Sequence, residues 1–250
     1  MPGDSNFVIV TMQRSGSNML GTLLNSHPQI KCFGELMRKT PRWMLEQGYR
    51  GALRILDKLD EYKDDQVRFS RPYDFINAVF ATKPKILIKG FKLHTDQHPD
   101  FLELLLRDPE YTVIVLQRDN ILAQYSSGKI AETTGQGNAP RGAEIKRARV
   151  EFNSVKFNRF VESVEENFKK VRALLAESGK KHFELKYAQL NDQDRLSELV
   201  LFLGADPTTE LQAGTEKRNS SDILSRFVNP DDARRAIDEM GRPEWARESV

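Results

Sequence analysis

The sequence predicts an α/β protein with a doubly wound parallel sheet flanked by helices. Short apolar runs alternate with helical patterns along the chain, which favours parallel strands joined by right-handed crossovers. The first run, residues 7–11, is nearly all apolar and rich in β-branched residues, as strands buried on both faces are. We expect strands at residues 7–11, 86–91, 112–117 and 182–187.

Between these runs, apolar residues recur at steps of three and four, which predicts helices. The first helix is expected to end at His27, because the residue before a proline resists the helical conformation. Two further apolar helix faces lie at residues 75–80 and 101–106. A longer stripe predicts a helix from about Ala143 to Gly179, since glycine is common just past a helix end.

Size and charge are those of an ordinary globular protein. A chain of 250 residues is expected to form a single domain that covers 1–250. Its 38 Lys and Arg residues barely exceed its 36 Asp and Glu residues, for a net charge of +2. This balance predicts no general attraction to nucleic acid or to an anionic membrane, so a bound anion must be held by a local cluster.

The sequence contains no pattern typical of a metal site, a signal peptide or a membrane span. The single cysteine, Cys32, excludes an internal disulfide and zinc-type spacing, and it weakly indicates a reducing compartment. The N-terminus has no basic segment followed by an apolar stretch, and no apolar window approaches the roughly 20 residues that a span needs. We therefore expect a cytoplasmic protein with no membrane span and no metal.

The polar loop after the first strand is a candidate anion site. Its candidate ligands are Arg14, Ser15, Gly16, Ser17 and Asn18. A helix N-terminus presents unpaired N–H groups and a partial positive charge, which suit a phosphate or a sulfate. Gly16 lets the backbone approach the anion, and Arg14 adds a permanent cation. The same pattern also suits an ordinary tight turn in which Ser17 caps the helix.

The order of strand, loop and helix is P-loop-like, but the loop is not a Walker A sequence. The pattern Gly-x-x-x-x-Gly-Lys-Ser/Thr is absent. The loop therefore gives no reason to expect a magnesium–ATP arrangement. A divergent P-loop kinase is accordingly a less favoured interpretation.

A second candidate site follows the clearest predicted strand. Arg118 lies at its carboxyl end, where ligands of open α/β sheets bind. Asp119 or Asn120 is expected to cap the next helix. Ser126 lies roughly 10 Å further along that helix, so that Arg118 and Ser126 suit the two sides of one large ligand group. An arginine in such a place is also often only solvated or ion-paired.

The residues from Phe7 to Leu20, with the Gly34-Glu35 pair downstream, resemble the N-terminal signature of sulfotransferases. These enzymes use 3′-phosphoadenosine 5′-phosphosulfate (PAPS) as the donor and release adenosine 3′,5′-bisphosphate (PAP). The chain is most similar to the bacterial carbohydrate and nodulation-factor type. The resemblance implies that the loop from Arg14 to Asn18 holds the 5′-phosphosulfate. Many members of the family have a lysine where Arg14 stands.

The resemblance extends to the second site and, more loosely, to the C-terminal third. Sulfotransferases bind the 3′-phosphate of PAPS with an arginine at a strand end and a serine eight positions later, which is the spacing of Arg118 and Ser126. Lys217 and Arg218 look like the basic loop that these enzymes place over the nucleotide. The alternative for these two residues is a solvated charged loop.

Two residues are candidates for the base that deprotonates the acceptor hydroxyl. Glu35 stands where carbohydrate sulfotransferases have a catalytic glutamate, and His94 stands in a Lys-x-His setting like that of the small-molecule enzymes. A histidine is already poised near neutral pH, whereas a glutamate needs burial to raise its pKa. We favour Glu35 and keep His94 as the alternative. Lys92 is expected to neutralise charge on the transferred group.

The acceptor is expected to be a hydroxylated molecule, by resemblance a carbohydrate or a glycolipid. Trp43, Trp245 and the aromatic residues of 69–80 are candidates to stack on it, although such residues are more often core. The segment Thr133–Gly142 is expected to form a mobile loop near the site. A nucleotide-binding scaffold without catalysis is the non-enzymatic alternative.

Overall fold

The central feature of the computed structural model is a five-stranded sheet in which every strand is parallel to its neighbours. The structure describes residues 5–137, 142, 144–214 and 219–248. The strands are β1 (Ser5–Thr11), β2 (Ile30–Glu35), β3 (Ile88–His94), β4 (Tyr111–Gln117) and β5 (His182–Lys186), in the spatial order β2-β3-β1-β4-β5. The expected α/β fold with a parallel sheet is confirmed.

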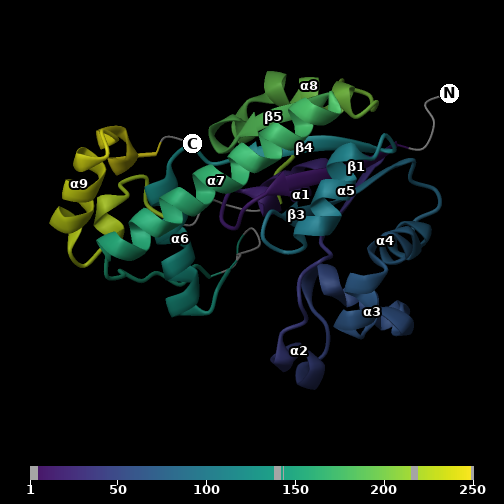
Figure 1. The fold of residues 1–250 in the computed structure, drawn as a ribbon, viewed down its shortest axis with the longest axis horizontal. Helices are drawn as coiled ribbons and strands as arrows, with labels where there is room; N and C mark the ends of the chain where they lie inside the picture. The colour runs from purple at the N-terminus through teal and green to yellow at the C-terminus, as the bar shows by residue number, and fades with distance from the viewer. Residues whose placement is uncertain (1–4, 138–141, 143, 215–218, 249–250) are drawn as a thin grey trace.

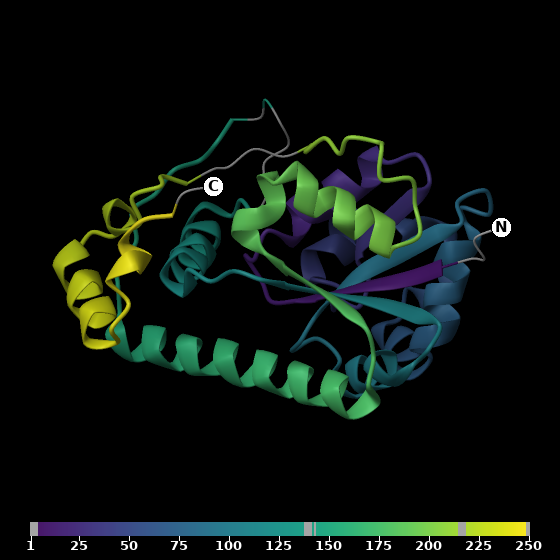
Figure 2. The same cartoon turned by 90° about the horizontal axis from the view of Figure 1, so that it is seen from above.

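Helices cover both faces of this sheet (Figures 1 and 2). The helices are α1 (Ser17–Ser26), α2 (Arg42–Gln47), α3 (Asp65–Ser70), α4 (Pro72–Ala81), α5 (Pro99–Arg107), α6 (Ile121–Thr134), α7 (Ser154–Ser178), α8 (Gln193–Phe202) and α9 (Pro230–Glu239). Helices α1 and α8 pack on one face, and α4, α5 and α7 pack on the other. Within the described residues, no helix is long and apolar enough to cross a membrane.

The central strand β1 shows why the apolar runs of the sequence have no polar side. Val8 and Val10 point into the core shared with α4, α5 and α7, whereas Phe7 and Ile9 point into the core shared with α1 and α8. Side chains alternate between the two faces of a strand, so a strand covered on both faces must be apolar throughout.

The register of the sheet brings the candidate site together. At the carboxyl edge, Thr11 of β1 is level with His94 of β3 and Leu116 of β4. The segments that follow these strands therefore emerge side by side, although they are far apart in the sequence. Both candidate anion sites lie at this edge.

The structure corrects three sequence-based expectations. Strand β2 was not expected; it lies at the sheet edge, only Ile30 and Cys32 of it are buried, and its register shifts between Cys32 and Glu35. The strand expected at residues 86–91 is β3 and runs two to three residues later, so Lys92 and His94 lie within it. Helix α7 begins at Ser154 and not near Ala143, because Asn153 caps it by accepting a hydrogen bond from the Lys156 N–H.

Gly90 is fixed by the close contact between β3 and β1. A Cβ atom at this position would lie 2.4 Å from both the ring and the carbonyl oxygen of Phe7. We expect Gly90→Ala to lower the free energy of unfolding by at least about 2 kcal/mol, because neither the buried ring nor the backbone can move away. Urea denaturation checks this expectation.

Gly21→Ala is the matched control. Gly21 lies inside α1, where an added Cβ would be 3.6 Å from the Cys32 Sγ, an ordinary contact. Alanine is the better helix former by about 1 kcal/mol, so this variant should be at least as stable as the wild type. A Gly90→Ala protein as stable as Gly21→Ala would contradict the argument.

Candidate active site

Hydroxyl groups shape the loop between β1 and α1. The Ser15 and Thr11 hydroxyls are hydrogen-bonded to each other, and each also lies 2.8 Å from a carbonyl oxygen, that of Met12 for Ser15 and that of Leu116 for Thr11. Ser15 is buried by these contacts. The side chain of Ser15 thus holds the loop against β4, and an anion-binding role for this residue rests on its main-chain N–H.

The backbone of this loop adopts positive φ angles at two positions, Arg14 and Gly16. Gly16, the N-cap of α1, has a φ of 90°, and an added Cβ there would lie 2.4 Å from the Tyr187 ring. Arg14 has a φ of 64°, the one positive value for a non-glycine residue in the described chain. Such a conformation is costly for an arginine and occurs mainly at functional sites.

Helix α6 and the segment after it anchor Arg14. Its Nε donates to the Ser127 hydroxyl at 3.0 Å, and its terminal nitrogen donates to the Gly137 carbonyl. The Gln124 side chain donates to the Gln13 carbonyl at 2.6 Å. Part of the loop expected at 133–142 therefore contacts the first anion site; residues 138–141 lie outside the described residues.

Lys92 connects the anion loop to β2. Its Nζ donates to the Asn18 side-chain oxygen, lies 3.5 Å from the Ser17 hydroxyl, and is 3.8 Å from a carboxylate oxygen of Glu35. Burial lowers the pKa of Lys92, and the charge of Glu35 partly opposes this effect. The cluster therefore joins the N-terminus of α1 to Glu35, one of the two candidate bases.

His94 lies behind Glu35. Its Nδ1 is 3.8 Å from Glu35 Oε1, and neither ring nitrogen has a hydrogen-bond partner in the described chain. The side chain of Gln97 holds both residues. Its NH2 group donates to Glu35, and its Oε1 accepts a hydrogen bond from the main-chain N–H of His94. Burial is the main cause that lowers the pKa of His94, so the ring is neutral at neutral pH.

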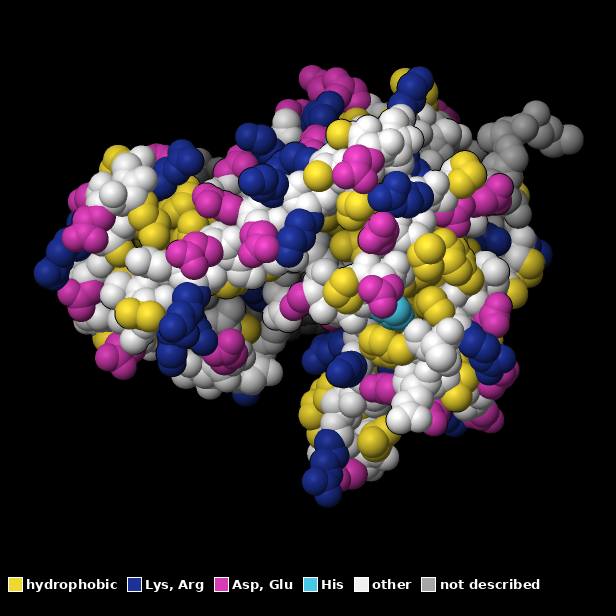
Figure 3. All heavy atoms as spheres, in the orientation of Figure 1, with side chains coloured by type: hydrophobic (Ala, Val, Ile, Leu, Met, Phe, Trp, Pro, Cys, Tyr) yellow, Lys and Arg dark blue, Asp and Glu magenta, His cyan; other side chains and the backbone are white. Residues whose placement is uncertain are grey.

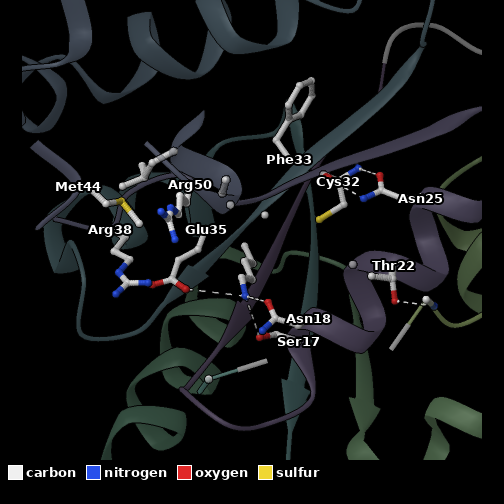
Figure 4. A pocket seen from close by; sticks show the side chains of 18 of the residues that line it. Ser17, Asn18, Thr22, Asn25, Cys32, Phe33, Glu35, Arg38, Met44 and Arg50 are labelled. Atoms are coloured by element: carbon white, nitrogen blue, oxygen red, sulfur yellow. Dashed lines mark hydrogen bonds and ion pairs between the residues drawn. The ribbon is translucent and has the colours of Figure 1, made fainter. Parts of the chain in front are cut away.

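A cavity of about 720 Å³ opens beside this cluster (Figure 4). Glu35 and Lys92 line it, together with Ser17 and Asn18 from α1. His94 is not part of the wall. The geometry thus separates the two candidate bases, because one faces the space where a substrate can bind and the other does not.

The second candidate site contains an ion pair that the sequence did not predict. Arg118 is buried, and its Nε donates to Glu248 Oε1 at 2.8 Å while a terminal nitrogen bonds the other carboxylate oxygen. A further nitrogen donates to the Arg14 carbonyl at 3.0 Å. The guanidinium also lies 4.3 Å from the centre of the Tyr187 ring. Arg118 therefore links both anion sites and already holds a carboxylate.

Ser126 contacts an arginine, Arg226, that the sequence analysis did not identify. Arg226 is buried and donates to the Ser126 hydroxyl at 3.0 Å. Burial, reinforced by the charge of Arg118, lowers the pKa of Arg226 to about 10. Arg226 and Glu248 lie about 100 and 130 residues from their partners, so no local pattern could have revealed them.

The remaining predicted residues are two basic residues for the nucleotide and several aromatic residues for the acceptor. Lys217 and Arg218 lie outside the described residues. Trp245 is in the core against Phe157, and the fully buried Phe75 is also unavailable to a ligand. Trp43 lines the cavity of Glu35 and is 41% exposed, so of these aromatic residues it retains the expected access to an acceptor.

Comparison with known proteins indicates the family to which the chain belongs. None of the curated proteins compared with the chain matches it. A sulfotransferase from Alicyclobacillus acidocaldarius, known from its crystal structure, is similar with a TM-score of 0.49 and 15% identity over 98% of this chain and 100% of that one. The model of the sulfotransferase family matches residues 6–207, a segment that includes the loop after β1, Glu35, Lys92 and Arg118. The chain therefore belongs to the sulfotransferase family, whose members are PAPS-dependent transferases.

Proposed function

We propose that this enzyme transfers the sulfuryl group of PAPS to a hydroxyl of a carbohydrate, with Glu35 as the base. The observation that carries the proposal is the position of Glu35 and Lys92. They lie next to each other on the cavity wall, beside the N-terminus of α1. A base, a cation and a helix N-terminus at one point are the groups that sulfuryl transfer needs.

The residues present fit the two anionic ends of PAPS. The Arg14–Asn18 loop and the first turn of α1 suit the 5′-phosphosulfate. Arg118, Arg226 and Ser126 suit the 3′-phosphate, because the bidentate contact of Arg118 with the Glu248 carboxylate has the geometry in which arginine also binds phosphate. On this assignment, the 3′-phosphate replaces Glu248.

In the proposed reaction, Glu35 accepts the proton of the acceptor hydroxyl as that oxygen bonds to sulfur. The bond between sulfur and the phosphate oxygen breaks, and its electron pair leaves with PAP. Lys92 and the N–H groups at the start of α1 face the oxygens on which charge develops. Gln97 orients Glu35 from behind through its side-chain hydrogen bond.

The carbohydrate assignment rests on the character of the cavity. Its wall includes polar side chains of α1, such as Asn18, Thr22 and Asn25, and the exposed ring of Trp43. Polar groups that fix hydroxyls, next to an aromatic face, are the usual features of a sugar site. A volume of about 720 Å³ is of the size that small ligands occupy.

Binding of PAP tests the function directly. With PAP at 100 times its Kd and no magnesium, the native state should gain about 2.7 kcal/mol, a rise in Tm of roughly 5–10 °C. Arg118→Ala should weaken PAP binding at least about tenfold, because charged hydrogen bonds to the phosphate are lost. A rise in Tm with magnesium–ATP alone would indicate a kinase, and no rise with either ligand would refute the proposal.

Glu248→Gln should strengthen PAP binding, whereas Arg118→Ala weakens it. The substitution removes the carboxylate that competes for Arg118, so the variant should bind PAP more tightly while being less stable without it. Glu244→Gln is the matched control, because Glu244 is exposed and 3.8 Å from Arg242. If Glu248→Gln and Glu244→Gln bound PAP equally, Arg118 would not be the 3′-phosphate ligand.

The two candidate bases give different kinetic results. Glu35→Gln should lower kcat by about 10² or more and leave the Kd for PAP nearly unchanged, since the amide cannot accept the proton. His94→Gln should lower kcat much less, because the ring does not line the cavity. Steady-state kinetics with calorimetric PAP binding checks both. The reverse order of effects would make His94 the base.

The neutral state of His94 can be tested by stability. Its pKa in the fold is below the ordinary 6.5, so between these values the unfolded chain binds a proton that the native chain does not. This contribution is fully present above pH 6.5 and is lost as the pH falls. The stability difference between the wild type and His94→Gln should therefore shrink from pH 7.5 to 5.5 in urea denaturation. A pH-independent difference would contradict the assignment.

A further inference from the structure

The segment between β2 and the 3-10 turn at Gly51–Lys58 forms one wall of the cavity. It contributes Arg38, Trp43 and Arg50 to the lining. Around α2 this segment projects from the body of the molecule and carries several Lys and Arg side chains (Figure 3). The Arg50 guanidinium lies 5.7 Å from the centre of the Trp43 ring, so a cation and an aromatic face are presented together.

The charge of Arg38 and Arg50 is not compensated within the described chain. Neither guanidinium forms an ion pair or a hydrogen bond there. The segment between β2 and Gly51 has one other arginine, Arg42, which lies 3.6 Å from Glu46. Within this segment, the two arginines without a carboxylate are thus the two that line the cavity.

The balance of charge in the cavity is positive. Glu35 is the one acidic residue of its described wall, and it is already paired with Lys92. The field of Arg38 reaches these residues: after burial and the nearer charges, it contributes to the lowered pKa of both Lys92 and His94. The positive charge therefore adjoins the reacting centre.

These arginines are on the acceptor side of the cavity. Figure 4 shows Arg38 and Arg50 on one side of Glu35 and the α1 residues Ser17 and Thr22 on the other. The anion loop and Arg118 lie beyond α1's first turn, at the donor side. A cation on the far side of the base would contact the acceptor molecule, which carries the hydroxyl, and not the nucleotide.

We propose that the acceptor is anionic: a sugar with a carboxylate or sulfate group that Arg38 and Arg50 bind while Trp43 packs against the ring. This inference rests on the proposed function. Arginine suits the role because its planar fork binds a carboxylate or sulfate through two hydrogen bonds. Neutral acceptors of the same shape leave both cations without a counter-ion.

Matched probes test the charge requirement. Phenyl β-D-glucuronide and phenyl β-D-glucoside share the ring and the hydroxyls at positions 2–4 and differ in the carboxylate. With PAP bound, the glucuronide should bind at least about tenfold more tightly, as one charged hydrogen-bond pair provides. Calorimetry gives the Kd, and quenching of Trp43 fluorescence, absent in Trp43→Phe, locates the probe. The 6-sulfate of the glucoside shows whether the site requires a carboxylate or binds either anion.

Substitutions assign the effect to the two arginines. Arg38→Gln and Arg50→Gln should each weaken glucuronide binding about tenfold, leave glucoside binding unchanged and leave the Kd for PAP unchanged. Arg42→Gln is the matched control from the same segment, because Arg42 pairs with Glu46 and does not line the cavity.

The outcomes separate this inference from the proposed function. Equal binding of the two glycosides, no binding of either, or an equal loss with Arg42→Gln overturns the anionic acceptor while intact PAP binding leaves the sulfotransferase standing. A weaker affinity for PAP in Arg38→Gln and Arg50→Gln also overturns it, since the arginines would then serve the donor. Failure of the wild type to bind PAP overturns the proposed function and this inference with it.

Discussion

Buried positive charge at the carboxyl edge of the sheet is the constraint on which the site depends. Lys92, Arg118 and Arg226 are each no more than 6% exposed. A cation this deeply buried costs several kcal/mol unless an anion accompanies it. The protein supplies Glu35 to Lys92 and Glu248 to Arg118, and it supplies hydroxyl and carbonyl oxygens to Arg226. Folding therefore produces an anion receptor that is already organised.

The charges at the second site do not cancel, and this imbalance favours phosphate. Arg118 and Arg226 lie near enough for the charge of one to lower the pKa of the other, and Glu248 brings a single negative charge to both. A phosphate monoester carries more charge than a carboxylate and offers three acceptor oxygens. A 3′-phosphate in place of Glu248 would thus neutralise more of the charge of the two arginines. The new contacts would offset the cost of breaking the internal ion pair.

Local sequence predicted the features that depend on local physics. Runs buried on both faces identified β1 and β4, and the strand-loop-helix turn located Arg14 to Asn18. Strand β2 escaped because it lies at the sheet edge, where one face is partly polar and Gly34 interrupts the ladder. Lys92 and Glu35 were named by resemblance, but their contact depends on the β2–β3 register. Arg226 and Glu248 reach the site only through the C-terminal packing around Trp245, which no periodicity encodes.

Lys92 also shows how substrate binding changes the site on the proposed roles. Burial disfavours its ammonium form, and this lowers its pKa. A sulfuryl group placed against the start of α1 brings negative charge to Nζ and opposes this effect, as Glu35 does. The buried charge of Lys92 is screened little by solvent, so it stabilises negative charge on the transferred group more strongly than an exposed lysine would. Glu35 lies 3.8 Å from Nζ on the acceptor side. Lys92 therefore keeps the base near the developing bond, while its own charge faces the transferred group.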